Sequence, residues 1–266
     1  MGDVLAELGK KVADLWLTTL LLPGLLLVAA VVCGGLLGQG DALDHARLAA
    51  EVQRRGSGMR PWPTALVLVV IAVLLAAAAA GLLARALGDG VNKLMMARRP
   101  QRCVRWRRDR AVRAAGVRTL PAAYLPQRVT AAGDSFRLVG ARVDAQYGLS
   151  VTRVWPRLWL LLSEQSRAPL VNGYASYQGA TRLIAWGLLY IALGVVWWPA
   201  GVAGAVAVVA GYRRATAAAA AVADLIEATV DVHQLDLAAA VGIPLAQGRL
   251  TPAEGAQIDN ILNKRG

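Results

Sequence analysis

Two long stretches with almost no charged side chains constrain this 266-residue chain more than any other feature. Leu15 to Leu37 is uncharged over 23 residues, and Thr64 to Leu87 carries only Arg85, close to its end. As α-helices these stretches would each rise about 35 Å, enough to cross a bilayer core of about 30 Å. We therefore expect two membrane-spanning helices, joined by an exterior polar loop at about 38–63.

A second apolar hairpin is expected later in the chain. Leu183 to Trp198 forms one limb, Gly201 to Tyr212 forms the return limb, and Trp197-Trp198-Pro199 marks a turn between them. The limbs would rise only about 24 Å and 18 Å, so the hairpin either crosses a thinned bilayer or is re-entrant. We favour crossing, because both ends then meet basic residues.

The segment between the two apolar regions is strongly basic. Gly88 to Thr181 carries 16 Lys or Arg against 5 acidic residues, so its net of +11 is nearly all of the chain's +12. Basic loops remain on the cytoplasmic side of membranes, which predicts a cytoplasmic location for this segment and for both termini. Arg outnumbers Lys 25 to 4 in an alanine-rich chain, which suggests a GC-rich bacterial source and hence a bacterial cytoplasmic membrane.

The predicted fold is all-α: two transmembrane helical hairpins, giving four spans with both termini inside, joined by a basic and mainly helical cytosolic domain. A long C-terminal helix is expected to extend into the cytosol, because no proline occurs from Gly201 to Ile243. The expected regions are the cytosolic N-terminus 1–14, the first hairpin 15–87, the basic domain 88–181, the second hairpin 182–214 and the helical C-terminal region 215–266.

Short-range signals predict several helix ends. Asp134-Ser135 is expected to cap a helix that stops at Gly148, and Pro169 is expected to begin the helix that leads into the second hairpin. Thr251-Pro252-Ala253-Glu254 reads as a capping box for a last helix over about Pro252 to Asn263.

Tryptophan is enriched at membrane–water interfaces, and six tryptophans are predicted to act as interfacial anchors. They are Trp16, Trp62, Trp155, Trp159, Trp197 and Trp198. Trp155 and Trp159 belong to Val151 to Leu162, which is too short to span and too apolar for a loop. That stretch either lies flat at the inner interface or is a core element of the basic domain.

An arginine-rich run follows the second predicted span and is the main candidate contact surface. It contains Arg98, Arg99, Arg102, Arg105, Arg107, Arg108 and Arg110. Contact with anionic lipids is the favoured interpretation, and the alternative is docking of an acidic protein or of this chain's own acidic tail. Nucleic acid is disfavoured, because Trp106 is a lone stacking platform without a recognisable binding module.

The acidic part of the chain is a stripe near its C-terminus. Asp224, Glu227 and Asp231 recur at i, i+3 and i+7, so one helix face presents all three carboxylates. Because this region and the arginine-rich run are predicted on the same side of the membrane, we expect the stripe to contact the basic segment after the second span.

No pattern in the sequence carries chemistry, so we expect no catalytic residues, no metal site and no cofactor. Cys33 and Cys103 lack metal-ligand spacing, and His233 beside the acidic stripe does not form a zinc-hydrolase motif. Coupled ion transport is also disfavoured, because the predicted spans hold no ionisable group except Arg85.

The sequence therefore favours a non-enzymatic anchor or scaffold subunit of a membrane complex, which recruits a protein partner through its basic domain and C-terminal helix. The alternative is a homo-oligomeric channel or membrane-perturbing effector gated by the cytosolic domain. In a channel, small-residue surfaces such as Ala76 to Gly81 would pack one subunit against another. In a scaffold subunit, they would pack helices within one chain.

Overall fold

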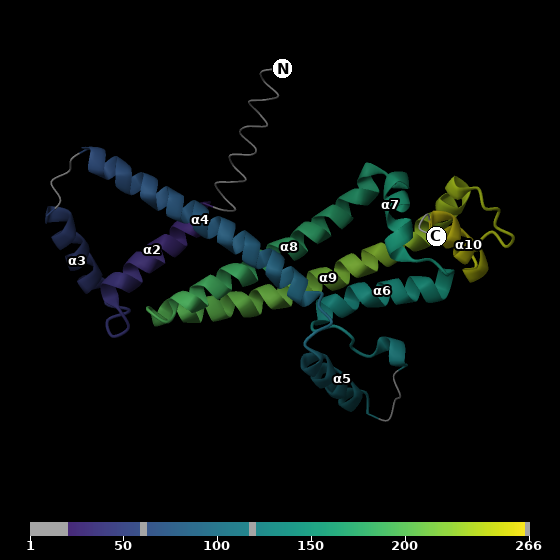
Figure 1. The fold of residues 1–266 in the computed structure, drawn as a ribbon, viewed down its shortest axis with the longest axis horizontal. Coiled ribbons are helices and arrows are strands. Elements are labelled where there is room, and N and C mark those ends of the chain that lie inside the picture. The colour runs from purple at the N-terminus through teal and green to yellow at the C-terminus, as the bar shows by residue number, and fades with distance from the viewer. Residues whose placement is uncertain (1–20, 59–62, 117–120, 264–266) are drawn as a thin grey trace, which may run out of the picture. The chain divides into compact units, whose positions relative to one another are not determined.

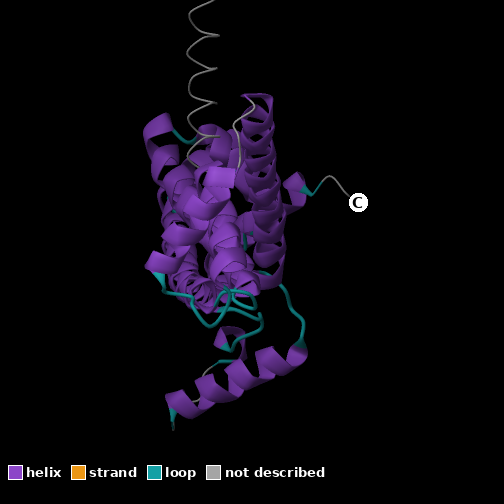
Figure 2. Cartoon of the chain, turned by 90° about the vertical axis from the view of Figure 1, so that its left-hand side faces the viewer, coloured by secondary structure: helices purple, strands orange, loops and turns teal. Residues whose placement is uncertain are grey.

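The computed structural model describes residues 21–58, 63–116 and 121–263, and every regular element in these ranges is a helix (Figure 2). The prediction of an all-α fold is confirmed. The elements, labelled in Figure 1, are α2 (Leu22–Leu37), α3 (His45–Gly58), α4 (Pro63–Met95), α5 (Gln101–Ala115), the 3₁₀ helix η2 (Ala122–Tyr124), α6 (Ala131–Tyr147), α7 (Val151–Leu161), α8 (Glu164–Leu193), α9 (Trp198–Val241) and α10 (Pro252–Leu262).

The chain divides into two compact units. Unit 1 consists of Met1–Val91 and Thr181–Tyr212, and unit 2 consists of Asn92–Ala180 and Arg213–Gly266. The long helices α4, α8 and α9 each contribute residues to both units.

Small residues hold the helices of unit 1 close together. A Cβ on Gly24 of α2 would overlap the backbone of Ala77 in α4, and Gly34 packs against the side chain of Trp197. In α8 and α9, a Cβ on Gly204 would lie 2.6 Å from the carbonyl oxygen of Gly187. Helices in lipid associate through such close backbone approach, because burial of apolar area gives little drive there.

A polar cluster closes one end of unit 1. The Gln39 side chain donates to the carbonyl oxygens of Gly194 (3.1 Å) and Val195 (2.6 Å) and accepts from the Trp198 backbone N–H (3.2 Å). The Trp197 indole donates to the Ala42 carbonyl oxygen at 2.9 Å. Carbonyl groups left free at the end of α8 are thereby satisfied.

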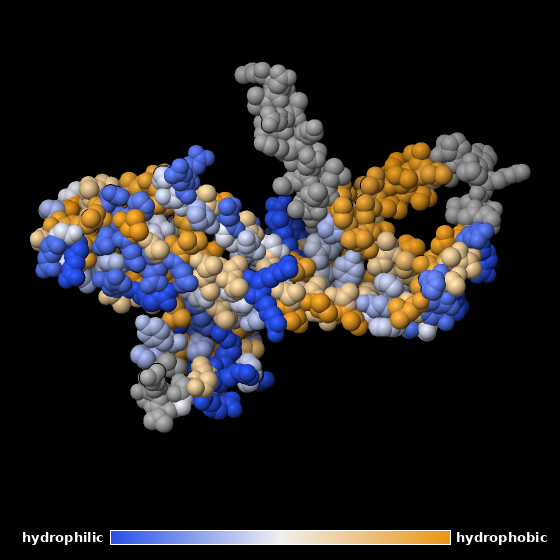
Figure 3. Space-filling view, turned by 180° about the vertical axis from the view of Figure 1, so that it is seen from behind, coloured by the Kyte–Doolittle hydropathy of each residue, from blue (hydrophilic) through white to orange (hydrophobic). Residues whose placement is uncertain are grey.

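Long helices of unit 1 expose apolar surface, whereas α3 is polar. Large side chains along α4, including Leu68 and Leu75, are more than half exposed, and Figure 3 shows this helix as an almost continuous hydrophobic stretch. Within the described residues, Leu66–Met95 is the one helical stretch long and apolar enough to cross a membrane by length and composition. The apolar α2 is shorter, and residues 15–20 of the first predicted span lie outside the described residues.

Unit 2 has a conventional buried core made by α6, α7, α9 and α10. The fully buried side chains at its centre are Val139, Val143, Leu149, Val154, Leu158, Val230, Leu237 and Ile258. Because Val154 and Leu158 belong to α7, this helix is a core element through one face. Its opposite face leaves Leu160 77% exposed.

Three local predictions need correction. The N-cap of α6 is Thr130, whose hydroxyl accepts from the Gly133 N–H at 3.2 Å, so Asp134 lies within the first turn instead of before it. Helix α8 begins at Glu164, where Ser163 caps the Ser166 N–H, and Pro169 lies inside it. The predicted exterior loop contains α3, which Asp44 caps through the Arg47 N–H.

Other predicted helix ends are confirmed. Helix α9 is continuous to Val241 and stops at Gly242, which has a positive φ of 79°. Thr251 and Glu254 form both hydrogen bonds of the capping box at α10. Gly148 ends α6 with φ 65°, a conformation in which glycine carries no steric penalty.

Candidate functional site

Helix α5 carries most of the arginine-rich run. Along α5 and the residues just before it, the guanidinium groups of Arg98, Arg99, Arg102, Arg105 and Arg108 are exposed. None of these five makes an ion pair or hydrogen bond with the described part of the chain. We call them the free arginines of α5. Such uncompensated positive charge is available to an anion from outside the chain.

Arg107 differs from its neighbours because it turns inward. Its guanidinium donates to the Asp134 carboxylate at 2.7 Å and to the Arg128 carbonyl oxygen at 2.6 Å, and its side chain is 20% exposed. This contact ties α5 to the start of α6. The sequence predicted Arg107 as a lipid or partner contact together with the others, but the structure gives it an internal partner.

Asp134 is the centre of this attachment. Its side chain is 8% exposed, and it accepts from the backbone N–H groups of Gln127 (2.9 Å) and Arg128 (3.0 Å) and from Arg137 (3.3 Å) in addition to Arg107. One carboxylate thus orders the loop before α6 and holds α5 in place. Buried charges of this kind require such pairing and hydrogen bonding.

The free arginines line a shallow concave surface at the first half of α5. It has a volume of about 460 Å³, and Arg98, Arg105 and Arg108 line it together with Gln101 and Gln127. Further along the helix, the Arg110 guanidinium lies 5.6 Å from the Trp106 ring centroid. Three guanidinium forks around one concavity present many N–H donors, the geometry that suits phosphate oxygens.

The acidic stripe contacts α6 rather than α5. Arg142 Nε donates to both oxygens of Glu227, at 3.0 and 2.8 Å, and Arg142 Nη2 lies 3.8 Å from Asp224. The Tyr147 hydroxyl donates to Asp231 at 2.7 Å. Arg142 belongs to the basic domain, but it is not one of the arginines directly after the second predicted span. The expected contact between the stripe and the basic segment is therefore present, and it is made at α6 and not at the arginine-rich run.

Burial, together with the hydrogen bond to the Asp231 carboxylate, raises the pKa of Tyr147 to about 12. An ionised Tyr147 would lose solvation and would face that carboxylate. The Tyr147 hydroxyl therefore stays protonated at ordinary pH and remains the donor in its hydrogen bond to Asp231.

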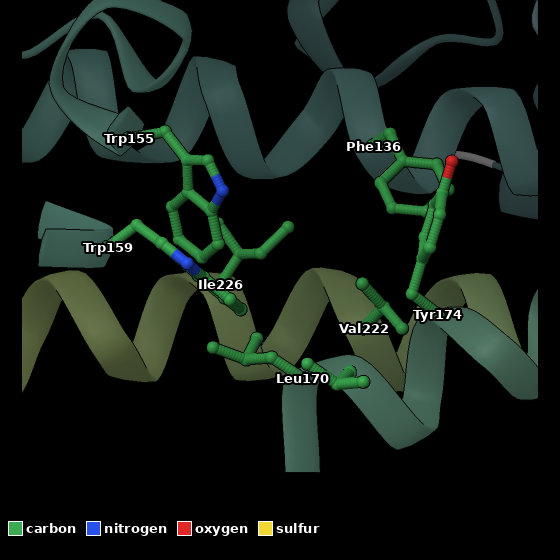
Figure 4. A pocket seen from close by; sticks show the side chains of 8 residues that line it. Phe136, Trp155, Trp159, Leu170, Tyr174, Val222 and Ile226 are labelled. Atoms are coloured by element: carbon green, nitrogen blue, oxygen red, sulfur yellow. The ribbon is translucent and has the colours of Figure 1, made fainter. Parts of the chain in front are cut away.

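An apolar pocket of about 400 Å³ lies in unit 2 between α6, α7, α8 and α9. Figure 4 shows Trp155 and Trp159 at one end and Phe136 and Tyr174 at the other. The remaining lining residues are Leu170, Val171, Val222 and Ile226.

No protein-family model, curated protein or solved structure matches this chain.

The predicted tryptophan anchors occupy different environments. Trp16 and Trp62 lie outside the described residues. Trp155 and Trp159 line the apolar pocket. The Trp197 indole donates a hydrogen bond to the Ala42 carbonyl oxygen, and Trp198 is 45% exposed at the turn between α8 and α9. Of these four described tryptophans, Trp197 and Trp198 lie at the turn of the apolar unit, where an interfacial anchor is expected.

Residues with catalytic or metal-binding potential do not gather. In the ranges 21–58, 63–116 and 121–263, no group of three or more His, Cys, Asp or Glu side chains could hold a metal ion. His233 Nδ1 lies 2.9 Å from Asp236 instead of joining the acidic stripe. Cys103 is exposed on α5, and Cys33 is partly buried in α2.

Two parts of this site were not predicted from the sequence: the Asp134 attachment and the apolar pocket. A signal for the first was present, because Val104, Arg107 and Ala111 share one face of α5 and two of these three are apolar. The pocket gave no such signal, because its lining residues come from four helices spread between Phe136 and Ile226 and their contact depends on the tertiary fold.

Proposed function

We propose that this chain is a multi-pass protein of the bacterial cytoplasmic membrane, in which unit 1 crosses the bilayer as two helical hairpins with both termini in the cytoplasm. In this proposal it serves as a non-enzymatic anchor or scaffold subunit. Unit 2 is its cytosolic part, and α5 is the surface that meets an anionic partner.

The contrast between the two surfaces carries the proposal. Unit 1 exposes large apolar side chains on α2, α4, α8 and α9, whereas unit 2 has a buried apolar core and exposes the free arginines. Exposure of the first surface to water is unfavourable, and burial of the second in the hydrocarbon core of a bilayer is unfavourable. A helix pair packed as closely as Gly24 and Ala77 also implies that if α4 enters the bilayer, α2 enters it too.

Anionic lipid is the first partner that we propose for α5. Each basic residue near a negatively charged leaflet contributes about 1 kcal/mol, so five free arginines contribute about 5 kcal/mol in total at low salt. That contribution weakens as salt screens the charges. An acidic protein that competes for the same arginines is the scaffold's recruited partner in this proposal.

The pore alternative receives less support from the packing. Gly187 and Gly204 meet each other inside unit 1, and Gly24 meets Ala77. These small residues are used for packing within one chain, so they do not supply a free surface between subunits. Reproducible single-channel steps from purified protein in planar bilayers would nevertheless favour the pore over the scaffold.

Membrane topology is tested by labelling single cysteines from outside the cell. Cys103 is exposed on α5, and a second variant carries Arg47→Cys on the predicted exterior loop, with the other cysteines replaced by serine. A membrane-impermeant maleimide should reach position 47 in intact cells and Cys103 only after permeabilisation. The opposite pattern would contradict the proposed orientation.

Lipid contact is tested with protein reconstituted into neutral and anionic vesicles. Hydrogen exchange of α5 should slow in vesicles that contain phosphatidylglycerol, and added salt should reverse the effect. A variant with Arg98, Arg105 and Arg108 changed to Gln should lose the difference. A control with Arg157 and Arg249 changed to Gln should keep it, because neither lies on α5 and neither makes an ion pair with the described residues. Equal protection in neutral vesicles would exclude electrostatic lipid contact.

A further inference from the structure

The apolar pocket of unit 2 has features that a core defect would not have. At about 400 Å³ it lies within the size range of small-molecule sites, about 300–1,000 Å³. Four helices build it, and four of its eight lining side chains are aromatic. Val171 and Tyr174 are about half exposed at the pocket, so it is open to an incoming ligand.

Two side chains near the tryptophan end of the pocket each have an N–H group without a hydrogen-bond partner among the described residues. Figure 4 shows the indole nitrogen of Trp155 facing the space between the lining side chains, and this N–H makes no hydrogen bond to any described residue. This N–H keeps access to water in the open pocket, and a ligand that displaced the water would have to offer an acceptor in its place. An acceptor supplied by a ligand would satisfy this N–H group.

The second polar group is the guanidinium of Arg167 at the start of α8. It lies 5.7 Å from the ring centroid of Trp159, which lines the pocket. Its Nε is buried and has no hydrogen-bond partner in the described part of the chain, while its Nη2 donates to the Leu160 carbonyl oxygen at 3.4 Å. No carboxylate pairs with Arg167 among the described residues.

We propose that this pocket binds the hydrocarbon chain of an anionic amphiphile, with Arg167 holding the anionic head group. The aliphatic and aromatic lining suits a flexible hydrocarbon chain, and an orphaned guanidinium nitrogen suits a carboxylate or phosphate. The source of the chain is either a free fatty acid or an acyl chain of an anionic phospholipid. This ligand site is separate from the free arginines of α5 and does not depend on their contact with lipid.

The pocket can be blocked without replacing a buried side chain. Val171→Trp places a large ring at a position that lines the pocket and is 52% exposed. Leu160→Trp is the matched control, because Leu160 is 77% exposed and does not line the pocket. Arg167→Gln removes the charge at the head-group position and leaves the pocket lining intact.

Binding is measured on the full chain in phosphatidylcholine nanodiscs, using a long-chain fatty acid that carries bromine near its terminus. Contact with bromine should quench the fluorescence of Trp155 and Trp159 in a saturable way. Val171→Trp should weaken this binding at least about tenfold, while Leu160→Trp should leave it within about twofold. Arg167→Gln should weaken binding of the fatty acid about tenfold but leave binding of the uncharged alcohol of equal length unchanged.

Native mass spectrometry of the chain released from its own membranes separates the two sources. A bound phospholipid that is lost in Val171→Trp assigns the site to a lipid tail, and an empty wild-type site that fills with added fatty acid assigns it to the free acid. Absence of both, or equal binding by wild type and Val171→Trp, overturns the proposal. Equal loss of acid and alcohol in Arg167→Gln removes the head-group assignment.

Discussion

The attachment of α5 to α6 depends on one carboxylate, so replacing Asp134 tests the organisation of unit 2. Asp134→Ala removes the acceptor for two guanidinium groups and two backbone N–H groups at once. Arg107 and Arg137 would remain only 20% and 15% exposed, without their carboxylate. Removing one partner of a buried ion pair costs about 3–5 kcal/mol.

The lower end of that range applies here, because both arginines can regain water by moving outward. A loss of about 3 kcal/mol corresponds to roughly a hundredfold rise in the opening equilibrium of this region. Hydrogen exchange followed by mass spectrometry measures that opening locally, and peptides covering Gln101 to Ala115 should exchange roughly a hundredfold faster. Exchange of α10, which does not contact Asp134, should not change.

Asp109→Asn is the matched control for the loss of one negative charge. Asp109 is exposed on α5, and its carboxylate has no ion pair with the described residues, so the substitution should shift stability by no more than about 0.5 kcal/mol. Asp134→Asn should fall between the two, because its amide oxygen still accepts from the backbone. Exchange of α5 in Asp134→Ala at the control rate would refute the view that this carboxylate holds the helix.

Three further substitutions test contacts in both units. Tyr147→Phe should lower the free energy of unfolding by about 1 kcal/mol, because it removes the hydrogen bond to Asp231. The folded pKa of Tyr147, about 12, exceeds the ordinary 10, so wild-type stability should be complete below pH 10 and fall between pH 10 and 12. Chemical denaturation across that range should show a smaller fall in the variant. Thr251→Ala should lower the free energy of unfolding by about 1 kcal/mol and speed hydrogen exchange at the start of α10. Backbone N–H groups of Ala246 and Thr251 lower the pKa of Glu254, so the wild-type α10 should also exchange faster as pH falls below 4.5. Gly204→Ala should destabilise unit 1 by about 1–3 kcal/mol, since its Cβ would meet backbone atoms, whereas Gly179→Ala, with open space around it, should be neutral or stabilising in thermal unfolding of detergent-solubilised protein.

Sequence reasoning succeeded where a helix boundary is encoded by adjacent residues. The capping box at Thr251, the stop at Gly148 and the continuity of α9 all depend on local hydrogen bonds or backbone conformations. It failed at α6 and α8, where several candidate residues compete. Thr130 and Ser163 cap these helices, while Asp134 and Pro169 give similar local signals a few residues later.

Side-chain partners were less predictable, because they depend on contacts across long separations. Arg142 and Glu227 are 85 residues apart, and Arg107 and Asp134 are 27 residues apart. In the sequence, Arg107 is one of seven similar arginines, and its inward direction follows from the buried carboxylate that faces it. The α7 stretch was left with two interpretations for the same reason, since only its packing against α6 and α10 selects the core position.

The distribution of carboxylates explains why α5 keeps its positive charge. Asp134, Glu227 and Asp259 are the acidic side chains of unit 2 that are at least partly buried and ion-paired, and each faces an arginine of the basic segment. These ion pairs position α6, α7 and α9, so the partly buried carboxylates of unit 2 are already paired within the unit. Asp109, the one acid on α5, cannot neutralise five arginines. Because like charges on one short helix repel each other, the free arginines do not stabilise the folded unit by themselves. In the function proposed above, an anion from outside the chain relieves this repulsion.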